Sequence, residues 1–311
     1  MGRSAVAAGD PWGEDVQIAL YTLLDLGYRG FADVHPAWET APAAVQAVNR
    51  LEELFLGAVT DEVGAVVAPG PEEVRAELDA IAHGDGPSLS AWIDERATIH
   101  HLREFAVHRS AYQLKEADPH TMALPRLAAG RAKSAYVEIQ ADEYGNGRPG
   151  RSHQELFAAT MRQLGLDERY GAYVDHLPAV TLATVNLLTL FGRSRRWLGA
   201  CVGHLALFEM TSVGPMARYA SAVRRVTGGD EGAEFYDVHV VADEHHQHVA
   251  LDAMVVPFVS DEPALASDVL FGARALTLVE TRFTAHLLDR WATNSTSLRR
   301  PVIRIRRTHA A

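Results

Sequence analysis

The sequence predicts an all-α fold, and three observations support this class. Apolar residues recur every three to four positions along most of the 311 residues, which is the period of an amphipathic helix. Strand-like alternation of apolar and polar residues is nearly absent. Gly, Pro and Asp, which interrupt helices, are widely spaced. At 48% hydrophobic residues the chain can bury a large core, so we expect a helical bundle with a helical extension at its N-terminal end.

Start and stop signals place the helices of the first half. Pro71 opens a favourable first turn because the missing N–H of proline would be unpaired there in any case. The GDGP segment at 84–87 breaks the chain. Asp118-Pro119 is expected to end a long helix, because the residue before proline avoids the helical region. The predicted helices are 14–27, 42–57, 71–83 and one from Ser88 or Ser90 to about Ala117, while the first dozen residues are expected to be frayed.

In the second half, Gly- and Pro-rich segments separate the expected helices. The loop 145–150 is too rich in Gly and Pro to be helical, and Ser152 can cap the next helix. A turn is expected at 228–230 and a bend at Pro257. The predicted helices are 131–144, 152–164, 168–176, 179–191, 195–225, 231–258 and 262–292.

Composition narrows the class of protein and its partners. The net charge of −11 argues against nucleic acid as the main partner. No apolar run reaches the roughly 18 residues of a membrane helix, and the N-terminus does not resemble a targeting segment. The single cysteine, Cys201, cannot form an internal disulfide, so we expect a cytoplasmic protein with no membrane partner.

The expected organisation has three parts. Residues 1–85 form the helical extension, 86–295 form the main domain, and 296–311 form a basic tail. The stretch RRPVIRIRR at 299–307 is more typical of a solvated tail, or of an arm on a neighbouring subunit in a possible homodimer, than of a nucleic-acid site.

Fifteen histidines, with only one cysteine, favour a search for imidazole and carboxylate metal sites. At about 100° per residue, Asp243 lies about 40° from His239 on the helical wheel and His246 about −20° from it. These three potential ligands therefore share one narrow face, and we interpret them as metal ligands rather than as separate core residues. The remaining polar side chains of the segment point elsewhere: Glu244, His245 and His248.

Glu209 is expected to be buried. Its helical neighbours are apolar, and an isolated buried carboxylate costs several kcal/mol unless it is paired or bound to a metal. An Arg–Glu pair inside the bundle is the alternative, but the face formed by His239, Asp243 and His246 favours a metal.

Two more segments add candidate ligands. Glu143 closes one helix and His153 opens the next, while Glu138 faces away from Glu143 and is interpreted as structural. Glu116 lies near the end of the long helix, where the helix dipole disfavours a free anion unless a cation neutralises it. By itself Glu116 could also be a solvated acid at a helix end.

His101, Glu104 and His108 form a rival group at spacings i, i+3 and i+7. We interpret them as a polar face or as support for the ligands. Glu104 and Glu116 are twelve residues apart, roughly 120° around one helix, so they are not expected to face the same cluster.

Carboxylates and imidazoles from several helices are the ligand set of a di-iron, oxygen-activating site in a helical bundle. Open coordination positions would receive O2. A structural zinc site is not expected because thiolate ligands are absent.

These residues resemble the haem-oxygenase-like di-iron oxidases, also called iron-containing redox enzymes, from about residue 90 to 258. The resemblance rests on KEADPH at 115–120, on VEIQADEYGNG at 137–147 followed by His153, on the helix of Glu209, and on His239-x3-Asp243-x2-His246. It implies a haem-oxygenase-like helical bundle with the metal ligands Glu116, Glu143, His153, Glu209, His239, Asp243 and His246.

The resemblance also implies a function. The expectation is a non-haem di-iron oxidase that uses two Fe(II)/Fe(III) ions, O2 as cosubstrate and an external electron donor to oxidise a small molecule in specialised metabolism. The spacing of Glu143 and His153 resembles the N-oxygenating members, which favours N-oxygenation of an amine or guanidine-like nitrogen. The alternatives are oxidative C–C cleavage or desaturation of an amino or fatty acid, and a non-catalytic iron- or haem-binding protein.

Overall fold

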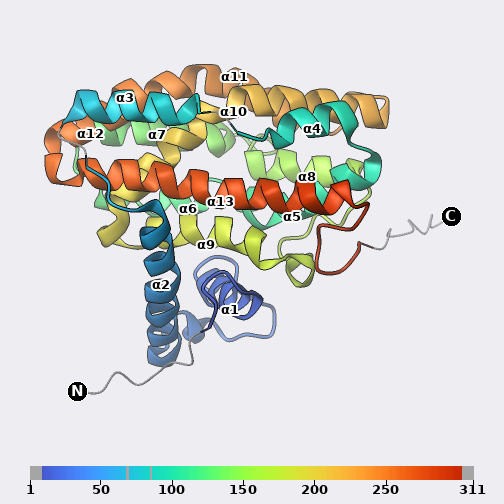
Figure 1. Cartoon of the computed structure of the whole chain (residues 1–311), viewed down its shortest axis with the longest axis horizontal. Helices are drawn as coiled ribbons and strands as arrows, with labels where there is room; N and C mark the ends of the chain where they lie inside the picture. The colour runs from blue at the N-terminus through green and yellow to red at the C-terminus, as the bar shows by residue number, and fades with distance from the viewer. Residues whose placement is uncertain (1–8, 68–69, 85, 303–311) are drawn as a thin grey trace.

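We analysed a computed structural model of the protein, in which residues 9–67, 70–84 and 86–302 are described (Figure 1). Every regular element within these ranges is a helix, which confirms the all-α class. The α-helices are α1 (Glu14–Asp25), α2 (Pro42–Val63), α3 (Pro71–Ala82), α4 (Leu89–Arg96), α5 (Ile99–Gln113), α6 (Asp118–Thr121), α7 (Arg131–Glu143), α8 (His153–Gln163), α9 (Ala179–Arg193), α10 (Leu198–Thr227), α11 (Glu234–His248), α12 (Val256–Asp261) and α13 (Ala266–Ala292).

The 30-residue helix α10 is the centre of the bundle and packs against α13, α11 and α4. Its contact with α13 is unusually close. A Cβ atom on Gly203 would lie 1.8 Å from the Val269 carbonyl oxygen, and one on Gly272 would lie 2.0 Å from the Ala200 carbonyl oxygen. The two backbones therefore meet at positions where only glycine fits.

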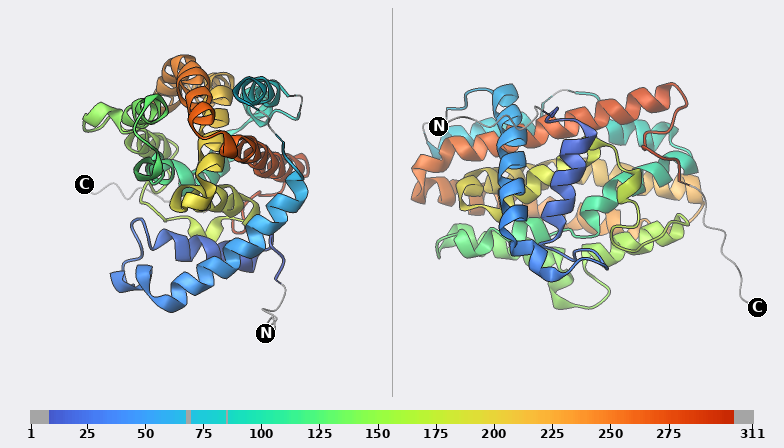
Figure 2. Two further views of the ribbon diagram at one scale, coloured as in Figure 1. Left: turned by 90° about the vertical axis from the view of Figure 1, so that its left-hand side faces the viewer. Right: turned by 90° about the horizontal axis from the view of Figure 1, so that it is seen from below.

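The N-terminal helices cover one side of this bundle. Helix α1 packs on α9, and α2 crosses α13 at a steep angle, as Figures 1 and 2 show. Helix α3 lies along α13 and α12. The inner face of α2 contributes the buried side chains Phe55, Leu56 and Val59 to the main core.

The expected long helix from Ser88 or Ser90 to Ala117 is wrong. Ala97 is extended, with φ −61° and ψ 138°, so α4 and α5 are separate helices. Thr98 then starts α5 through a capping box with His101. At the other end α5 stops at Gln113, and Pro119 lies in the first turn of α6, where proline is favoured, instead of ending a helix.

Two further helices differ from expectation. Residues 168–176 contain only a 3-10 turn, Val174–His176, because the Asp167 side chain accepts a hydrogen bond from the Arg169 backbone N–H (3.0 Å) and competes with a helix. The helix expected over 231–258 begins at Glu234 and changes to a π-helix over Val249–Val255 before α12. Pro257 falls in the first turn of α12 and causes no break.

The described part of the basic tail returns to the N-terminal helices. Arg299 Nε lies 3.4 Å from Glu14 Oε2, and the Arg299 backbone N–H donates to the His176 carbonyl (2.9 Å). Most of the arginine-rich stretch, 303–307, lies outside the described residues. None of the described helices is both long enough and apolar enough to cross a lipid bilayer.

Replacing Gly203 by alanine tests the close contact of α10 with α13. We expect Gly203→Ala to lower the free energy of unfolding by about 1–3 kcal/mol, because the new methyl group overlaps the α13 backbone. Gly57→Ala is the matched control, since a Cβ at Gly57 in α2 has no neighbour within 4 Å. It should raise stability by about 0.5–1 kcal/mol. Denaturant unfolding followed by circular dichroism measures both, and equal effects would contradict the packing described.

Candidate metal centre

Seven acidic and imidazole side chains meet in the interior of the bundle. Glu143 is the last residue of α7, His153 is the first of α8, and Glu209 lies in the middle of α10. Each of the seven is at most 6% exposed. They are the same seven that the sequence pattern singled out: Glu116, Glu143, His153, Glu209, His239, Asp243 and His246.

A tight loop brings Glu143 and His153 together. Gly145 has φ +65°, and a Cβ atom there would lie 2.5 Å from the Arg151 carbonyl carbon, so the chain turns back on itself at this glycine. Ser152 then starts α8 with a capping box that includes Glu155. As a result, His153 Nδ1 lies 2.7 Å from Glu143 Oε2.

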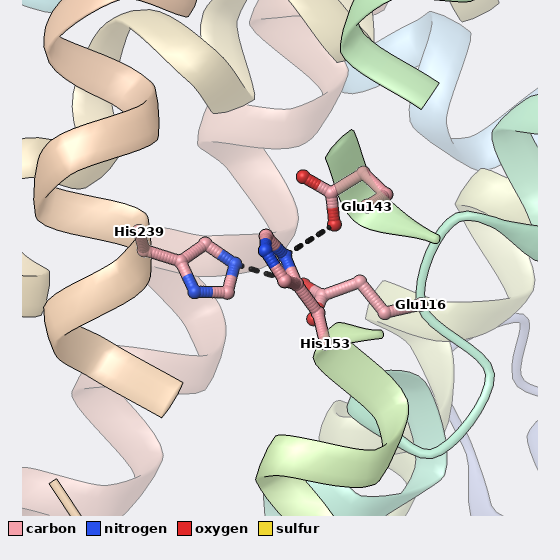
Figure 3. Close-up of side chains that lie close together, drawn as sticks. All are labelled: Glu116, Glu143, His153 and His239. Carbon is pink, nitrogen blue, oxygen red and sulfur yellow. Dashed lines mark ion pairs between the residues drawn. The ribbon is translucent and has the colours of Figure 1, made fainter. Parts of the chain in front are cut away.

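The first ligand group combines four segments of the chain. One atom each of Glu116, Glu143, His153 and His239 lie within 4.8 Å of one another. Figure 3 shows these four side chains extending toward a common centre. His239 Nε2 is 3.7 Å from Glu116 Oε1, and the rings of His153 and His239 have centroids 4.1 Å apart.

The second ligand group includes Glu143 again, together with Glu209 and His246, within the same 4.8 Å limit. His246 Nδ1 lies 3.4 Å from Glu209 Oε2 and 3.7 Å from Asp243 Oδ1. One carboxylate is therefore common to two adjacent groups. The shared carboxylate lies between two sets of side chains, each of which could hold a metal ion.

Neighbouring groups orient two of the imidazoles. His239 Nδ1 donates to the Phe235 carbonyl oxygen (2.7 Å), which leaves Nε2 facing Glu116. His246 Nε2 lies 3.0 Å from Asp142 Oδ2, so its Nδ1 is free to face Glu209 and Asp243. A hydrogen bond on the far nitrogen is the usual support of a metal-binding histidine.

The unpaired atoms of this site fit a bound cation. Glu116 Oε2, both Asp243 oxygens and His246 Nδ1 are buried without a hydrogen-bond partner, while His153 Nδ1 and Glu143 Oε2 have only each other, at 2.7 Å. Leaving such groups unsatisfied costs about 1–3 kcal/mol each, and more when they are charged. A cavity of about 10 Å³, the size of a single water molecule, lies between them. Oxygen and imidazole donors without thiolate suit iron or manganese.

Burial and the imidazoles act in opposite directions on the carboxyl groups. Burial raises the pKa of Glu209 to about 8 and also raises the pKa of Glu116. Burial opposes the charge of Glu143 as well, but the imidazoles, foremost His153, outweigh it and lower the pKa of Glu143 to about 2. Without metal, Glu209 therefore holds a proton at neutral pH, and so do His239 and His246, whose pKa values the neighbouring carboxylates raise to about 10 and about 11.

Glu116 was expected at the C-terminal end of a long helix. It lies instead in the loop after α5. Glu116 is therefore not exposed to the dipole of a helix C-terminus, and no helical angle relates it to Glu104, because α5 ends at Gln113. Contacts of the Glu116 backbone and of the neighbouring Lys115 side chain fix its position. Gln154 Nε2 donates to the Glu116 carbonyl (2.8 Å), and Lys115 forms a buried ion pair with Asp25 of α1 (3.0 Å).

The rival group of His101, Glu104 and His108 lies outside the centre. The Glu104 carboxylate accepts hydrogen bonds from the Ser297 hydroxyl (2.6 Å) and the Trp291 indole (2.9 Å). His108 contacts Ser297 Oγ and a threonine hydroxyl, and His101 caps α5. These residues anchor the segment C-terminal to α13.

Asp142 contacts the centre but was not predicted from the sequence, because one acidic residue beside another gives no periodic signal. Glu138, interpreted as structural, lies on the outer face of α7, with Oε1 2.9 Å from His245 Nε2.

Comparison with known proteins agrees with this geometry. Residues 103–281, more than half of the chain, match the model of a family described as iron-containing redox enzymes. Over 213 residues the chain is 25% identical to the nitrosourea synthase of Streptomyces achromogenes subsp. streptozoticus. The aligned region covers 67% of this chain but 45% of that enzyme, so this chain spans less than half of its relative. The match over residues 103–281 shows that the chain belongs to the iron-containing redox enzyme family.

Proposed function

We propose that the chain is an oxidoreductase that holds two iron ions and uses O2 to oxidise a small molecule, with nitrogen as the atom oxidised. The observation that carries the proposal is the buried Glu143, which belongs to two adjacent ligand groups. The relative's name denotes formation of a nitrosourea, a compound with an oxidised nitrogen. This likeness favours N-oxygenation over C–C cleavage or desaturation.

The two ligand groups divide the metal-binding role. Glu116, His153 and His239 would hold one ion, Glu209 and His246 the other, and Glu143 would bridge them. Asp243 lies beside His246 and would complete the second site. The bound iron would supply the electrons that reduce O2, and an external electron donor would restore them.

The surrounding residues control water and protons. Tyr112, Leu205 and Phe208 close the small cavity around the ligands. Glu209 Oε2, 3.4 Å from His246 Nδ1, belongs to a carboxyl group with a pKa of about 8, so this group holds a proton near neutral pH until a metal displaces it.

Haem binding has less support. The cavity between the ligands is about 10 Å³, far too small for a porphyrin. The larger adjacent pocket, of about 360 Å³, has no histidine among the described residues that line it, so a haem there would lack a proximal imidazole.

Substitution of Glu116 tests its assignment as a ligand. We expect the unaltered chain to bind about two irons and Glu116→Ala about one, with loss of O2-dependent turnover, because the first site loses a carboxylate. Glu104→Ala is the control, since Glu104 contacts Ser297 and Trp291 instead. Iron analysis after anaerobic loading measures both, and a loss of iron in Glu104→Ala alone would reverse the assignment.

Substitution of Glu143 tests whether it bridges. Glu143→Gln keeps the shape but removes the charge shared by both groups, so we expect iron content to fall below about one per chain. Glu138→Gln, on the outer face of the same helix, should retain about two. If Glu143→Gln loses only one iron, Glu143 serves a single site.

Iron binding should also depend on pH. A metal displaces the proton of Glu209 and also those of His239 and His246, whose pKa values neighbouring carboxylates raise to about 10 and about 11, so the apparent affinity for Fe(II) should rise with pH through 8 and beyond it. Calorimetric titrations in buffers with different ionisation enthalpies count the protons released. Glu209→Gln should release fewer protons near neutral pH than the unaltered chain, and an equal release would show that Glu209 is already ionised.

A further inference from the structure

A second, larger pocket lies next to the metal centre. Its volume is about 360 Å³, within the range of small-molecule sites. Phe208 and Ser212 of α10 line both this pocket and the small cavity between the ligands, so the two spaces are neighbours.

Helix α5 shows how the pocket is oriented. Phe105, Arg109 and Gln113, one turn apart, line the pocket, while Tyr112 and Glu116 line the metal cavity. The pocket therefore follows α5 for two turns, about 12 Å, and Gln113 marks the end that approaches the metal centre.

The walls are mostly apolar and favour a hydrophobic body. Aromatic and aliphatic side chains from several helices form them. The volume is about 36 times that of the small cavity, which has the size of one water molecule, so the pocket has room for a ligand of at least a dozen non-hydrogen atoms. The apolar residues include Phe105, Phe157, Leu207, Phe208, Phe235 and Leu276.

The pocket offers no unpaired charge. Arg109 and Glu280 are the only charged side chains among the described residues that line it, and they form a bidentate ion pair with distances of 2.9 and 2.8 Å. The Arg109 guanidinium also lies 4.5 Å from the centre of the Phe283 ring. A ligand with a net charge would lose hydration here without gaining a counter-ion.

Gln113 provides one unsatisfied polar group. It is 4% exposed, and its Oε1 has no hydrogen-bond partner. A buried carbonyl oxygen of this kind accepts a hydrogen bond from an N–H or O–H group. Gln113 follows Tyr112 and precedes Glu116 by three residues, so a donor group bound to it lies at the end of the pocket toward the metal centre.

We propose that this pocket binds the substrate, and that the substrate is an uncharged amine with a hydrophobic body whose N–H donates to Gln113. The inference rests on the proposed function, since it identifies the oxidised nitrogen with this N–H group. An uncharged nitrogen suits both the lack of a free counter-ion and the lone pair that N-oxygenation requires.

Binding of para-alkylanilines tests the proposal, because they are uncharged at neutral pH and carry N–H donors. We expect para-butylaniline to bind the iron-loaded, oxygen-free chain and also the metal-free chain, as measured by calorimetry. Affinity should rise about fourfold per methylene from the methyl to the butyl homologue. The carboxylate analogue, para-butylbenzoate, should bind at least about tenfold more weakly. Equal affinities for the methyl to butyl homologues, or tighter binding of para-butylbenzoate than of para-butylaniline, would overturn the proposal.

Two variants locate the ligand. Gln113→Leu should weaken the binding of para-butylaniline about five- to tenfold. It should leave the binding of the N,N-dimethyl derivative, which has no N–H, unchanged. Leu276→Trp, which fills the pocket, should weaken both compounds. Gln163→Leu, at the exposed end of α8, is the matched control and should change neither. Equal loss of both ligands in Gln113→Leu, or unaltered binding in Leu276→Trp, would overturn the assignment.

The outcomes separate this inference from the proposed function. If para-butylaniline binds as expected but no amine is oxidised with O2, the proposed function fails and the pocket assignment stands. If a small, polar amine is oxidised while the alkylanilines do not bind, the pocket assignment fails and the proposed function stands.

Discussion

Four carboxyl groups buried beside three imidazoles are the constraint on which this structure depends. Such a cluster is unfavourable among apolar helices because each charge loses its hydration and the carboxylates repel one another. Two features lower this cost. Glu209 keeps a proton near neutral pH, and His246 forms a hydrogen bond with Asp142 at the edge of the cluster. Atoms of Asp243 and Glu116 still remain without partners, and a cation is the species that would satisfy them together.

The N-terminal helices contribute to this centre although they supply none of its ligands. Asp25 of α1 pairs with Lys115, which is 1% exposed and precedes Glu116 in the chain. The Tyr170 hydroxyl also donates to Asp25. Removing one partner of a buried ion pair costs about 3–5 kcal/mol, so this extension stabilises the loop that carries Glu116. Ala117, with φ +73°, shows how sharply that loop turns.

Sequence periodicity was sufficient for the parts of the site that lie on regular helices. His239, Asp243 and His246 share one face of α11, and Glu209 lies in an apolar stripe, so counting at 100° per residue placed them correctly. The surroundings of Glu116 could not be predicted in this way, because a backbone turn and contacts with α1 and α8 position it. The break at Ala97 is marked by neither glycine nor proline, and only Thr98, a residue type that often starts helices, signals it.

The large pocket could not be predicted from the sequence either. Its walls come from separate helices, and the pairing of Arg109 with Glu280 joins residues that are 171 positions apart. Gln113 carries no motif and becomes informative only once its carbonyl is seen to be buried and unpaired. Residues of this kind depend on tertiary packing, which no local pattern contains.

The π-helix over Val249–Val255 separates the ligand-bearing helix α11 from α12. A π-turn holds one residue more than an α-turn, so the two sides of it differ in phase by about 100°. Phe258 and Val259 of α12 are buried after this offset, and His239, Asp243 and His246 are buried before it. Loss of a single residue from this segment would rotate α12 out of the core and leave the metal face unchanged. The length of this segment therefore sets the phase of α12 relative to α11.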